Sequence, residues 1–383
     1  MTFSLHRFFL STLLLALVLP VARGQVNVPV STLPRVAISM GGANGPAYTQ
    51  IVSADLRRTG EISPVAGNGD FTATGEGTDG GLSGQLVNRR TGETVFSQTF
   101  SGAGRMAAHE FADAITQAVT GRPGFASSRL AFVGVGSGDK ELFLADMDGF
   151  NTRAITHDHT ISASPALSRD GTKLAYTSYK SGYPDVYLID LASGQRTRIA
   201  FFPGINSGPS FSPDGSQIAL TLSKDGNPEI YTMPISGGEP TRITRTRGSE
   251  TSPCWSPDGS QLVYSSDDRT GSPQLYISTS QGVGDMDHLV TGNVYCTKPD
   301  WSPDGRLIAF TARVGGVFQI GVFNLASRTA RLVTTSGGED PAWTRDSRHL
   351  VYASKEGRIL LLDTLTGQSL PIGVNGAEPA VSR

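Results

Sequence analysis

The segment "ETSPCWSPDGSQLVYSSD", residues 250–267, recurs in nearly the same form about every 44 residues. The related copies are "ASPALSRDGTKLAYTS" (163–178), "SGPSFSPDGSQIALTLS" (207–223), "TKPDWSPDGRLIAFTA" (297–312) and "EDPAWTRDSRHLVYAS" (339–354). A last copy, "AEPAVSR" (377–383), is truncated. An internal period of this length predicts an array of equivalent structural units.

Each unit has the content of four short strands. The run Ser256-Pro257-Asp258-Gly259 is typical of a tight turn, because proline presets φ and glycine supplies the permissive last position. Leu262-Val263-Tyr264 follows and is apolar on both sides, which predicts a strand packed on both faces. Runs such as "DVYLID" and "TRIA" supply a third and a fourth strand. Four strands per unit predict one propeller blade.

The two ends of the repeat region complete each other. The first strands carry the prolines Pro165, Pro209, Pro253, Pro299, Pro341 and Pro379. The last of these has no following strands, whereas "RLAFVGVG", "ELFLADMDG" and "TRAIT" (129–156) have no first strand before them. Joining the ends gives a closed ring, which hides the sheet edges. We therefore predict a mainly β fold, a six-bladed β-propeller over residues 126–383. Two turns depart from the pattern, and "TRDS" (344–347) lacks glycine, so we expect that turn to be distorted.

A small α/β domain is predicted over residues 35–125. "RVAIS" and "DFTATGEG" read as strands, and "LSGQLVNRRTGETVFSQTF" reads as a hairpin. "PAYTQIVSADLRRTG" and "RMAAHEFADAITQAVTG" have the periodicity of helices. His109 lies in the second helix, where we expect it to be solvated or half-buried. Residues 25–34 form an extended N-terminal segment in this scheme.

The start of the chain predicts export. "MTFSLHRFFLSTLLLALVLPVARGQ" has Arg7, a leucine-rich run and then small residues, which is typical of a signal peptide over residues 1–24. The apolar run is roughly a dozen residues against the about 20 that a membrane helix needs; a retained anchor is the alternative. The net charge of −2 offers no basic footprint for nucleic acid. Cys254 and Cys296 are more consistent with buried free thiols than with a disulfide.

The sequence motifs do not indicate an enzyme. There is no G-x-S-x-G nucleophile motif and no room for a separate hydrolase domain. His157-Asp158-His159 is the one tempting metal cluster, but a metal needs further ligands of suitable geometry, so we expect an exposed polar loop. We predict no catalytic residue, no metal site and no cofactor.

The chain resembles the TolB family of the Tol-Pal envelope system. The resemblance is carried by the repeat, by "IVSADLRRTG" in the N-terminal region and by "FADAITQAVTGRPGFASSRLAFV" leading into the first blade. It implies a periplasmic, non-enzymatic and monomeric adaptor that meets the envelope membranes only through its partners. The implied partners are the lipoprotein Pal and, less directly, TolA, with a role in outer-membrane integrity and cell division.

The resemblance also implies where the partners bind. The loops before the blade prolines match the family's Pal-facing surface, and in this sequence they carry Ile205, Asn206, Ser207, Glu250, Thr251, His157, Thr297 and Glu339. The N-terminal segment, with Val26, Asn27, Val28 and Pro29, would serve the second partner. This segment is shorter than is usual in the family, and Ile205 stands where a histidine is common. Two alternatives stay open: an exported propeller that binds or processes peptides or glycans, and a TolB-like paralogue in another envelope complex.

Overall fold

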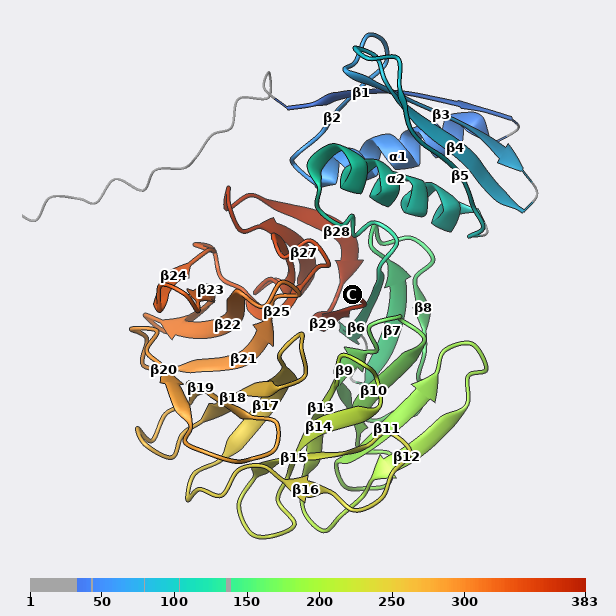
Figure 1. Ribbon diagram of the computed structural model, residues 1–383. Helices are drawn as coiled ribbons and strands as arrows, with labels where there is room; N and C mark the ends of the chain where they lie inside the picture. The colour runs from blue at the N-terminus through green and yellow to red at the C-terminus, as the bar shows by residue number, and fades with distance from the viewer. Residues whose placement is uncertain (1–32, 43, 79, 103, 136–138) are drawn as a thin grey trace, which may run out of the picture.

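The computed structural model describes residues 33–42, 44–78, 80–102, 104–135 and 139–383. It contains a small α/β domain and a six-bladed β-propeller (Figure 1). The predicted fold class is confirmed. Within the described residues no helix has the length and apolar character needed to cross a membrane.

The N-terminal domain is one five-stranded sheet with two helices on a single face. Its strands lie in the order β2-β1-β3-β4-β5, with β1 parallel to both neighbours and the rest antiparallel. Tyr48, Val52 and Phe111 from the helices pack into its core. The elements are β1 (Arg35–Gly41), α1 (Gly45–Arg58), β2 (Ser63–Val65), β3 (Phe71–Thr78), β4 (Gly81–Asn88), β5 (Thr94–Phe100) and α2 (Arg105–Thr120).

The propeller consists of six four-stranded antiparallel sheets. The first strands line the central channel: β29 (Ala377–Val381), β9 (Ser162–Leu167), β13 (Asn206–Phe211), β17 (Glu250–Trp255), β21 (Cys296–Trp301) and β25 (Glu339–Trp343). The second strands are β6 (Arg129–Val135), β10 (Lys173–Ser178), β14 (Gln217–Leu222), β18 (Gln261–Ser266), β22 (Leu307–Val314) and β26 (His349–Ala353). The third strands are β7 (Lys140–Asp146), β11 (Asp185–Asp190), β15 (Glu229–Pro234), β19 (Gln274–Thr279), β23 (Val317–Asn324) and β27 (Arg358–Asp363). The outer strands are β8 (Arg153–Ala154), β12 (Arg196–Ala200), β16 (Thr241–Arg242), β20 (Asp287–Leu289), β24 (Thr329–Leu332) and β28 (Ser369–Asn375).

The ring closes between the two ends of the repeat region, as predicted. β29 pairs antiparallel with β6, and Val381 lies opposite Leu130. The second strands are the most buried: Leu262, Val263 and Tyr264 are fully covered because neighbouring blades pack on both of their faces.

The repeated turn has one hydrogen-bond pattern throughout. The Gly259 amide donates to the Ser256 carbonyl (2.9 Å), the Ser256 hydroxyl donates to the Asp258 carboxylate (2.6 Å), and Gly259 takes a φ of 74°. The turn without glycine keeps this arrangement. Ser347 takes a φ of 56° and its amide donates to the Thr344 carbonyl over a longer 3.3 Å. The expected distortion is therefore limited to this longer bond.

Both cysteines are free and buried. The Cys254 thiol donates to the Asp300 carboxylate at 3.3 Å, and burial raises the pKa of this thiol. The prediction of buried free thiols is confirmed.

The N-terminal domain docks on the propeller through buried charged groups. His109 on α2 is fully buried, so the expectation of a solvated or half-buried histidine is wrong. Its Nδ1 lies 2.6 Å from Asp55 Oδ2 on α1, and its Nε2 lies 3.7 Å from Asp148 Oδ2 on the propeller. Arg105 also pairs with Asp148. One face of α2 packs on the sheet and another on the propeller, so both faces are covered (Figure 1).

Candidate partner-binding face

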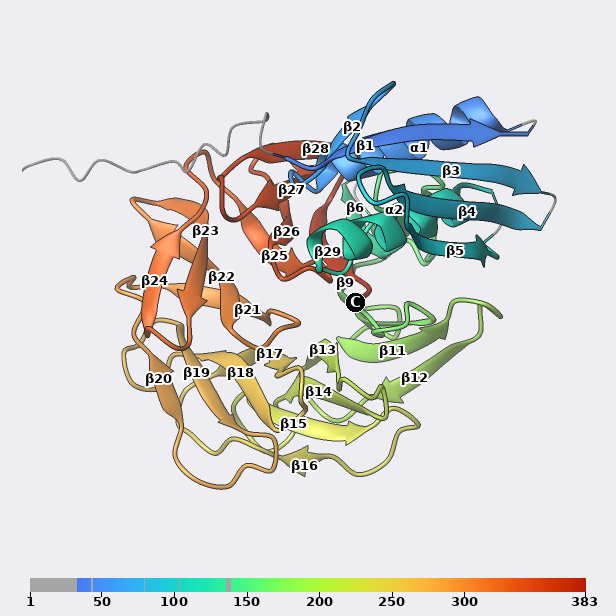
Figure 2. The ribbon, with the colours of Figure 1, turned by 45° about the horizontal axis from the view of Figure 1, so that its top comes forward.

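The antiparallel order of each blade divides the loops between two faces of the ring. Loops that lead into a first strand and hairpins between second and third strands lie on one face. Turns between first and second strands and between third and fourth strands lie on the other. The N-terminal domain contacts Asp148, Arg345 and Arg348, which all belong to the second set of turns. We call the face with the N-terminal domain proximal and the opposite face distal. Figure 2 shows the domain to one side of the ring opening.

The residue before each blade proline has a left-handed backbone. The φ values are 48° at Ser164, 60° at Gly208, 56° at Ser252, 52° at Lys298, 54° at Asp340 and 49° at Glu378. At the same place the pairing of first and second strands shifts register in all six blades. A bulge of this kind bends the strand and re-aims its side chains. Left-handed non-glycine residues are uncommon and cluster at functional sites.

The bulge fixes which residues near the proline are accessible. The residue two positions before the proline is half-buried in every blade and directly precedes the first residue that lines the channel, so we call its place the distal rim: Ala163, Ser207, Thr251, Thr297, Glu339 and Ala377. The residue three positions before is buried in every blade: Ser162, Asn206, Glu250, Cys296, Gly338 and Gly376. Because side chains alternate along the first strand, those of the residues three positions before the proline point between the blades.

Two predicted partner-contacting residues are therefore corrected. Asn206 and Glu250 are fully buried, so their side chains cannot face a partner. The Asn206 amide nitrogen donates to the carbonyls of Phe202 (2.8 Å) and Pro184 (3.1 Å), and its oxygen accepts from the Phe202 amide (2.9 Å). Asn206 thus holds the loop that presents Ile205.

Glu250 belongs to a buried pair of carboxyl groups. Glu229 on β15 is also fully buried, and its Oε1 accepts from Arg242 (2.7 Å). Burial raises the pKa of Glu250 to about 7, and the charge of Glu229 adds to this, whereas hydrogen bonds from Ser266 and Thr246 oppose it. Burial would also raise the pKa of Glu229, but hydrogen bonds, including one from Glu250 and one from Arg242, lower it. Below about pH 7, therefore, Glu229 carries the charge and Glu250 the proton.

The other predicted residues lie on the distal face. Ile205 is exposed, and Ser207, Thr251, Thr297 and Glu339 share the half-buried rim position. His157 is exposed in the loop before β9. Val26, Asn27, Val28 and Pro29 lie outside the described residues.

The loop with His157 matches the expectation of a polar surface segment. The carboxylate of Asp158 pairs with Lys180 (2.7 Å) and with Arg196, and these contacts hold its pKa below the ordinary value although burial opposes them. His159 Nδ1 lies 3.1 Å from Asp139. Asp158 is thus paired with two cationic side chains, and His159 lies beside a different carboxylate.

Sequence reasoning missed the apolar side chains of the distal face. Within the described residues, nine of the fourteen large apolar side chains that are exposed lie there, which marks this face as the more apolar one. They are Ile161, Tyr179, Tyr183, Phe201, Ile205, Val290, Val294, Val314 and Val317. The signal was available, because tyrosine, phenylalanine and valine stand in these loops among turn-forming residues. A face that exposes many large apolar side chains is a candidate interaction surface.

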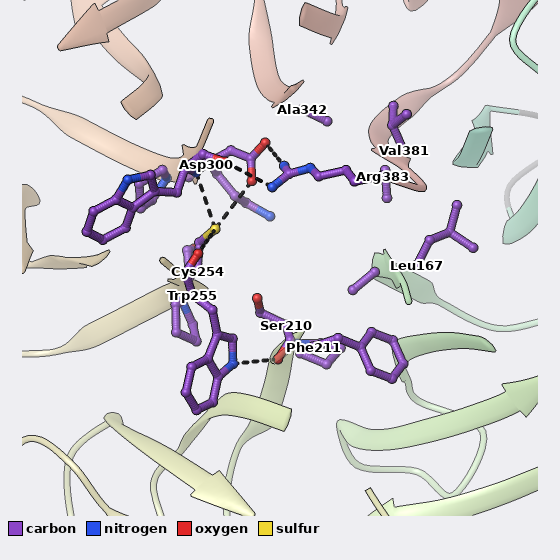
Figure 3. A pocket seen from close by; sticks show the side chains of 18 of the residues that line it. Leu167, Ser210, Phe211, Cys254, Trp255, Asp300, Ala342, Val381 and Arg383 are labelled. Atoms are coloured by element: carbon purple, nitrogen blue, oxygen red, sulfur yellow. Dashed lines mark hydrogen bonds and ion pairs between the residues drawn. The ribbon is translucent and has the colours of Figure 1, made fainter. Parts of the chain in front are cut away.

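The channel itself is narrow and crossed by an ion pair. A cavity of about 230 Å³ runs along the first strands. Arg383 reaches across the blade that carries Ala342 and pairs with Asp300 (Figure 3). Its guanidinium also donates to the Trp301 carbonyl at 2.9 Å. Asp300 in turn accepts from the backbone amide of Trp343 (2.7 Å), so the crossing is held from three blades.

The left-handed φ before each blade proline can be tested for its cost in folding free energy. At Gly208 an added Cβ would meet nothing closer than the Ser252 amide nitrogen at 3.9 Å, so only backbone conformation opposes a side chain. Gly208→Ser should lower the free energy of unfolding by about 1 kcal/mol. Gly67→Ser is the matched control, since Gly67 is exposed, has open space and does not need a left-handed φ. Urea unfolding measures both; equal values for the two variants would contradict the expected cost.

Comparison with known proteins identifies a family model over most of this architecture. The model of the TolB beta propeller domain matches residues 116–369. The Tol-Pal system protein TolB of Methylococcus capsulatus is 36% identical over 178 residues, covering 38% of this chain and 41% of that protein. The Tol-Pal system protein TolB of Bordetella pertussis is 35% identical over 186 residues, covering 40% and 42%. The chain thus spans about two fifths of the length of these curated relatives.

A solved structure extends the likeness to both domains. The crystal structure of TolB from Acinetobacter baumannii superposes with a TM-score of 0.79 and 29% sequence identity. The superposition covers 91% of this chain and 96% of that one. The likeness therefore includes the N-terminal α/β domain as well as the propeller.

Proposed function

Because this chain belongs to the TolB β-propeller family, we propose that it is a periplasmic, non-enzymatic adaptor of the Tol-Pal system. In this proposal the distal face binds the lipoprotein Pal. The N-terminal segment, including Val26–Pro29, couples the protein to TolA. The assembly maintains outer-membrane integrity and constriction during cell division. Residues 1–24 act as the export signal.

The grouping of exposed apolar side chains on the distal face carries this proposal. Tyr183 and Val294 are 74% and 78% exposed, and they stand on loops of different blades. Protein–protein interfaces place apolar and aromatic groups at their centre within a polar rim. Ser207, Thr251, Thr297 and Glu339 add polar groups to the same face, nearer the channel.

The fold supports a preformed docking platform. Backbone pairing within each blade and packing between blades hold the loop ends in place. Asn206 adds side-chain bonds that fix the Ile205 loop. Preorganised surfaces lose little conformational entropy on binding. The N-terminal domain sits on the proximal side, so it leaves the distal face free for a partner.

The decisive experiment is a calorimetric titration of the mature chain with the periplasmic domain of Pal from the same organism. Saturable one-to-one binding is expected. Absence of binding by a folded sample at high micromolar concentration would favour a paralogue in another envelope complex. Binding or turnover of peptides or glycans would favour the other alternative.

Two valines on opposite faces provide a matched pair of variants. Val294→Glu on the distal face should weaken Pal binding at least about tenfold, since a buried carboxylate would oppose the apolar contact. Val283 is 70% exposed on the proximal face, and Val283→Glu should leave binding unchanged. Thr251→Arg should also weaken binding by placing a bulky cation at the rim. Equal affinities of the two valine variants would assign Pal to a different surface.

A further inference from the structure

The turn between first and second strands differs between the two halves of the ring. Its second position is proline in three consecutive blades, at Pro213, Pro257 and Pro303. In the other three consecutive blades this position is arginine, at Arg345, Arg383 and Arg169.

Arg383 occupies the same position of the repeated turn as Pro257 by geometry as well as by sequence. The hydroxyl of Ser382, the residue before it, accepts from the Arg129 amide at 2.8 Å. The hydroxyl of Ser256 accepts from the Gln261 amide in the same way at 2.9 Å. The arginine positions are therefore a second version of the repeated turn, confined to one half of the ring.

These three arginines line a single cavity of about 980 Å³ on the proximal face. Arg306 and Arg331, from the adjacent blade of β21–β24, line it as well. Asp304 and Asp346 are the acidic residues of its wall. Asp346 is engaged by His349, whose Nδ1 lies 2.6 Å from its Oδ2. We call this space the arginine cavity.

Three guanidinium groups of the arginine cavity lack an acidic partner. Among the described residues, the side chains of Arg169 and Arg306 make no hydrogen bond or ion pair, and Arg331 donates only to the Thr364 carbonyl (2.7 Å). Burial lowers the pKa of Arg331. Like charges that converge on one cavity repel one another, and an anion between them would relieve that repulsion.

Arginines on one part of the cavity wall already pair with carboxylates of the chain itself. Glu61 of the N-terminal domain lies 2.8 Å from Arg348 and 3.6 Å from Arg122, both on the cavity wall. Asp113 lies 3.8 Å from Arg345. Carboxylates of the N-terminal domain thus already pair with three arginines of the cavity wall, and the planar guanidinium group matches the planar carboxylate.

We propose that the arginine cavity binds an acidic peptide segment of a partner protein, at a site separate from the distal face. The guanidinium groups of Arg169, Arg306 and Arg331, which have no acidic partner among the described residues, would pair with its carboxylates. The cavity has the size of a ligand-binding cleft. This site does not depend on the proposed Pal interaction, so either can fail without the other.

The test uses a fluorescein-labelled decapeptide with six glutamates and a matched peptide with six glutamines. The full mature chain should bind the glutamate peptide, more weakly as salt rises, and should not bind the glutamine peptide. The double variant Arg169→Gln/Arg306→Gln should weaken binding by about tenfold or more, because each charge-assisted bond lost is a substantial fraction of the affinity. Both side chains are exposed and unbonded, so the fold should be retained, as a melting curve checks.

Arg90→Gln is the control, since Arg90 is an exposed arginine on the β4–β5 hairpin of the other domain. It should leave peptide binding unchanged. Equal loss with the control, equal binding of the two peptides, or no effect of the double variant would overturn the proposal. Arginine-dependent binding to vesicles of phosphatidylglycerol and phosphatidylcholine without peptide binding would also overturn it, in favour of a phosphate headgroup.

Discussion

Replacing His109 by leucine is expected to lower the free energy of unfolding by about 3 kcal/mol at pH 6, because it breaks a buried ion pair and leaves Asp55 and Asp148 with one arginine partner each, Arg58 and Arg105. Asp55 and Asp148 are both almost completely buried, and His109 stands between them. Urea unfolding of the variant measures the loss. Limited proteolysis at residues 121–128 should also become faster, since the contact between the two domains is weakened.

The effect of His109→Leu should depend on pH in a defined direction. Burial lowers the pKa of His109, but the hydrogen bond and charge of Asp55, with the charges of Asp148 and Asp146, outweigh it and raise the pKa above 6.5. A raised histidine pKa contributes stability that is complete below the unfolded value and is lost as pH rises through the folded value. The difference between wild type and variant should therefore shrink above neutral pH. His157→Leu, at an exposed histidine, should show no such difference.

Glu250→Gln should stabilise the protein at alkaline pH. The pKa of Glu250 is raised to about 7, so the folded state binds more protons than the unfolded state between about pH 4.5 and 7. The wild type should lose roughly 2–3 kcal/mol of stability between pH 5 and 8 from this group. Glutamine cannot ionise, so its Tm should equal that of the wild type at pH 5 and exceed it at pH 8.

Glu229→Gln tests the assignment of charge within the same pair. Glu229 is the carboxylate that pairs with Arg242, so its replacement removes a needed charge. This variant should be less stable than the wild type at both pH 5 and pH 8, and the difference should shrink only in acid, where the wild-type Glu229 becomes protonated. Stabilisation by Glu229→Gln and destabilisation by Glu250→Gln would show that the proton resides on the other partner.

The architecture could be predicted because the repeat contains strong local signals. The Ser256–Gly259 turn and the apolar run at Leu262–Tyr264 recur, so each copy supports the others. Ring closure followed from counting strands at the two ends, and β29 does pair with β6. The two helices of the N-terminal domain could be predicted from their periodicity and from Gly121, which ends α2 with a φ of 75°.

The accessibility of the candidate site could not be predicted as fully. The residues before each proline read as loop, but the first strand already begins at Asn206 and Glu250. Alternation then turns these side chains between the blades. The left-handed backbone at Lys298 and Glu378 is equally hidden from sequence, since neither residue type favours it. The burial of His109 was not predicted, because the apolar periodicity of α2 indicates only the face that packs on the sheet. It does not indicate the face that packs on the propeller.

The pairing of β29 with β6 has a consequence for how the protein is made. The Arg129 amide bonds to the Ser382 hydroxyl, 253 positions further along the chain. A ribosome releases β6, β7 and β8 long before β29, so that blade waits with one edge unsatisfied while the others form. Such non-local pairing is slow and leaves an edge open to other chains. A nascent chain stalled before residue 377 should therefore depend on chaperones to stay unaggregated.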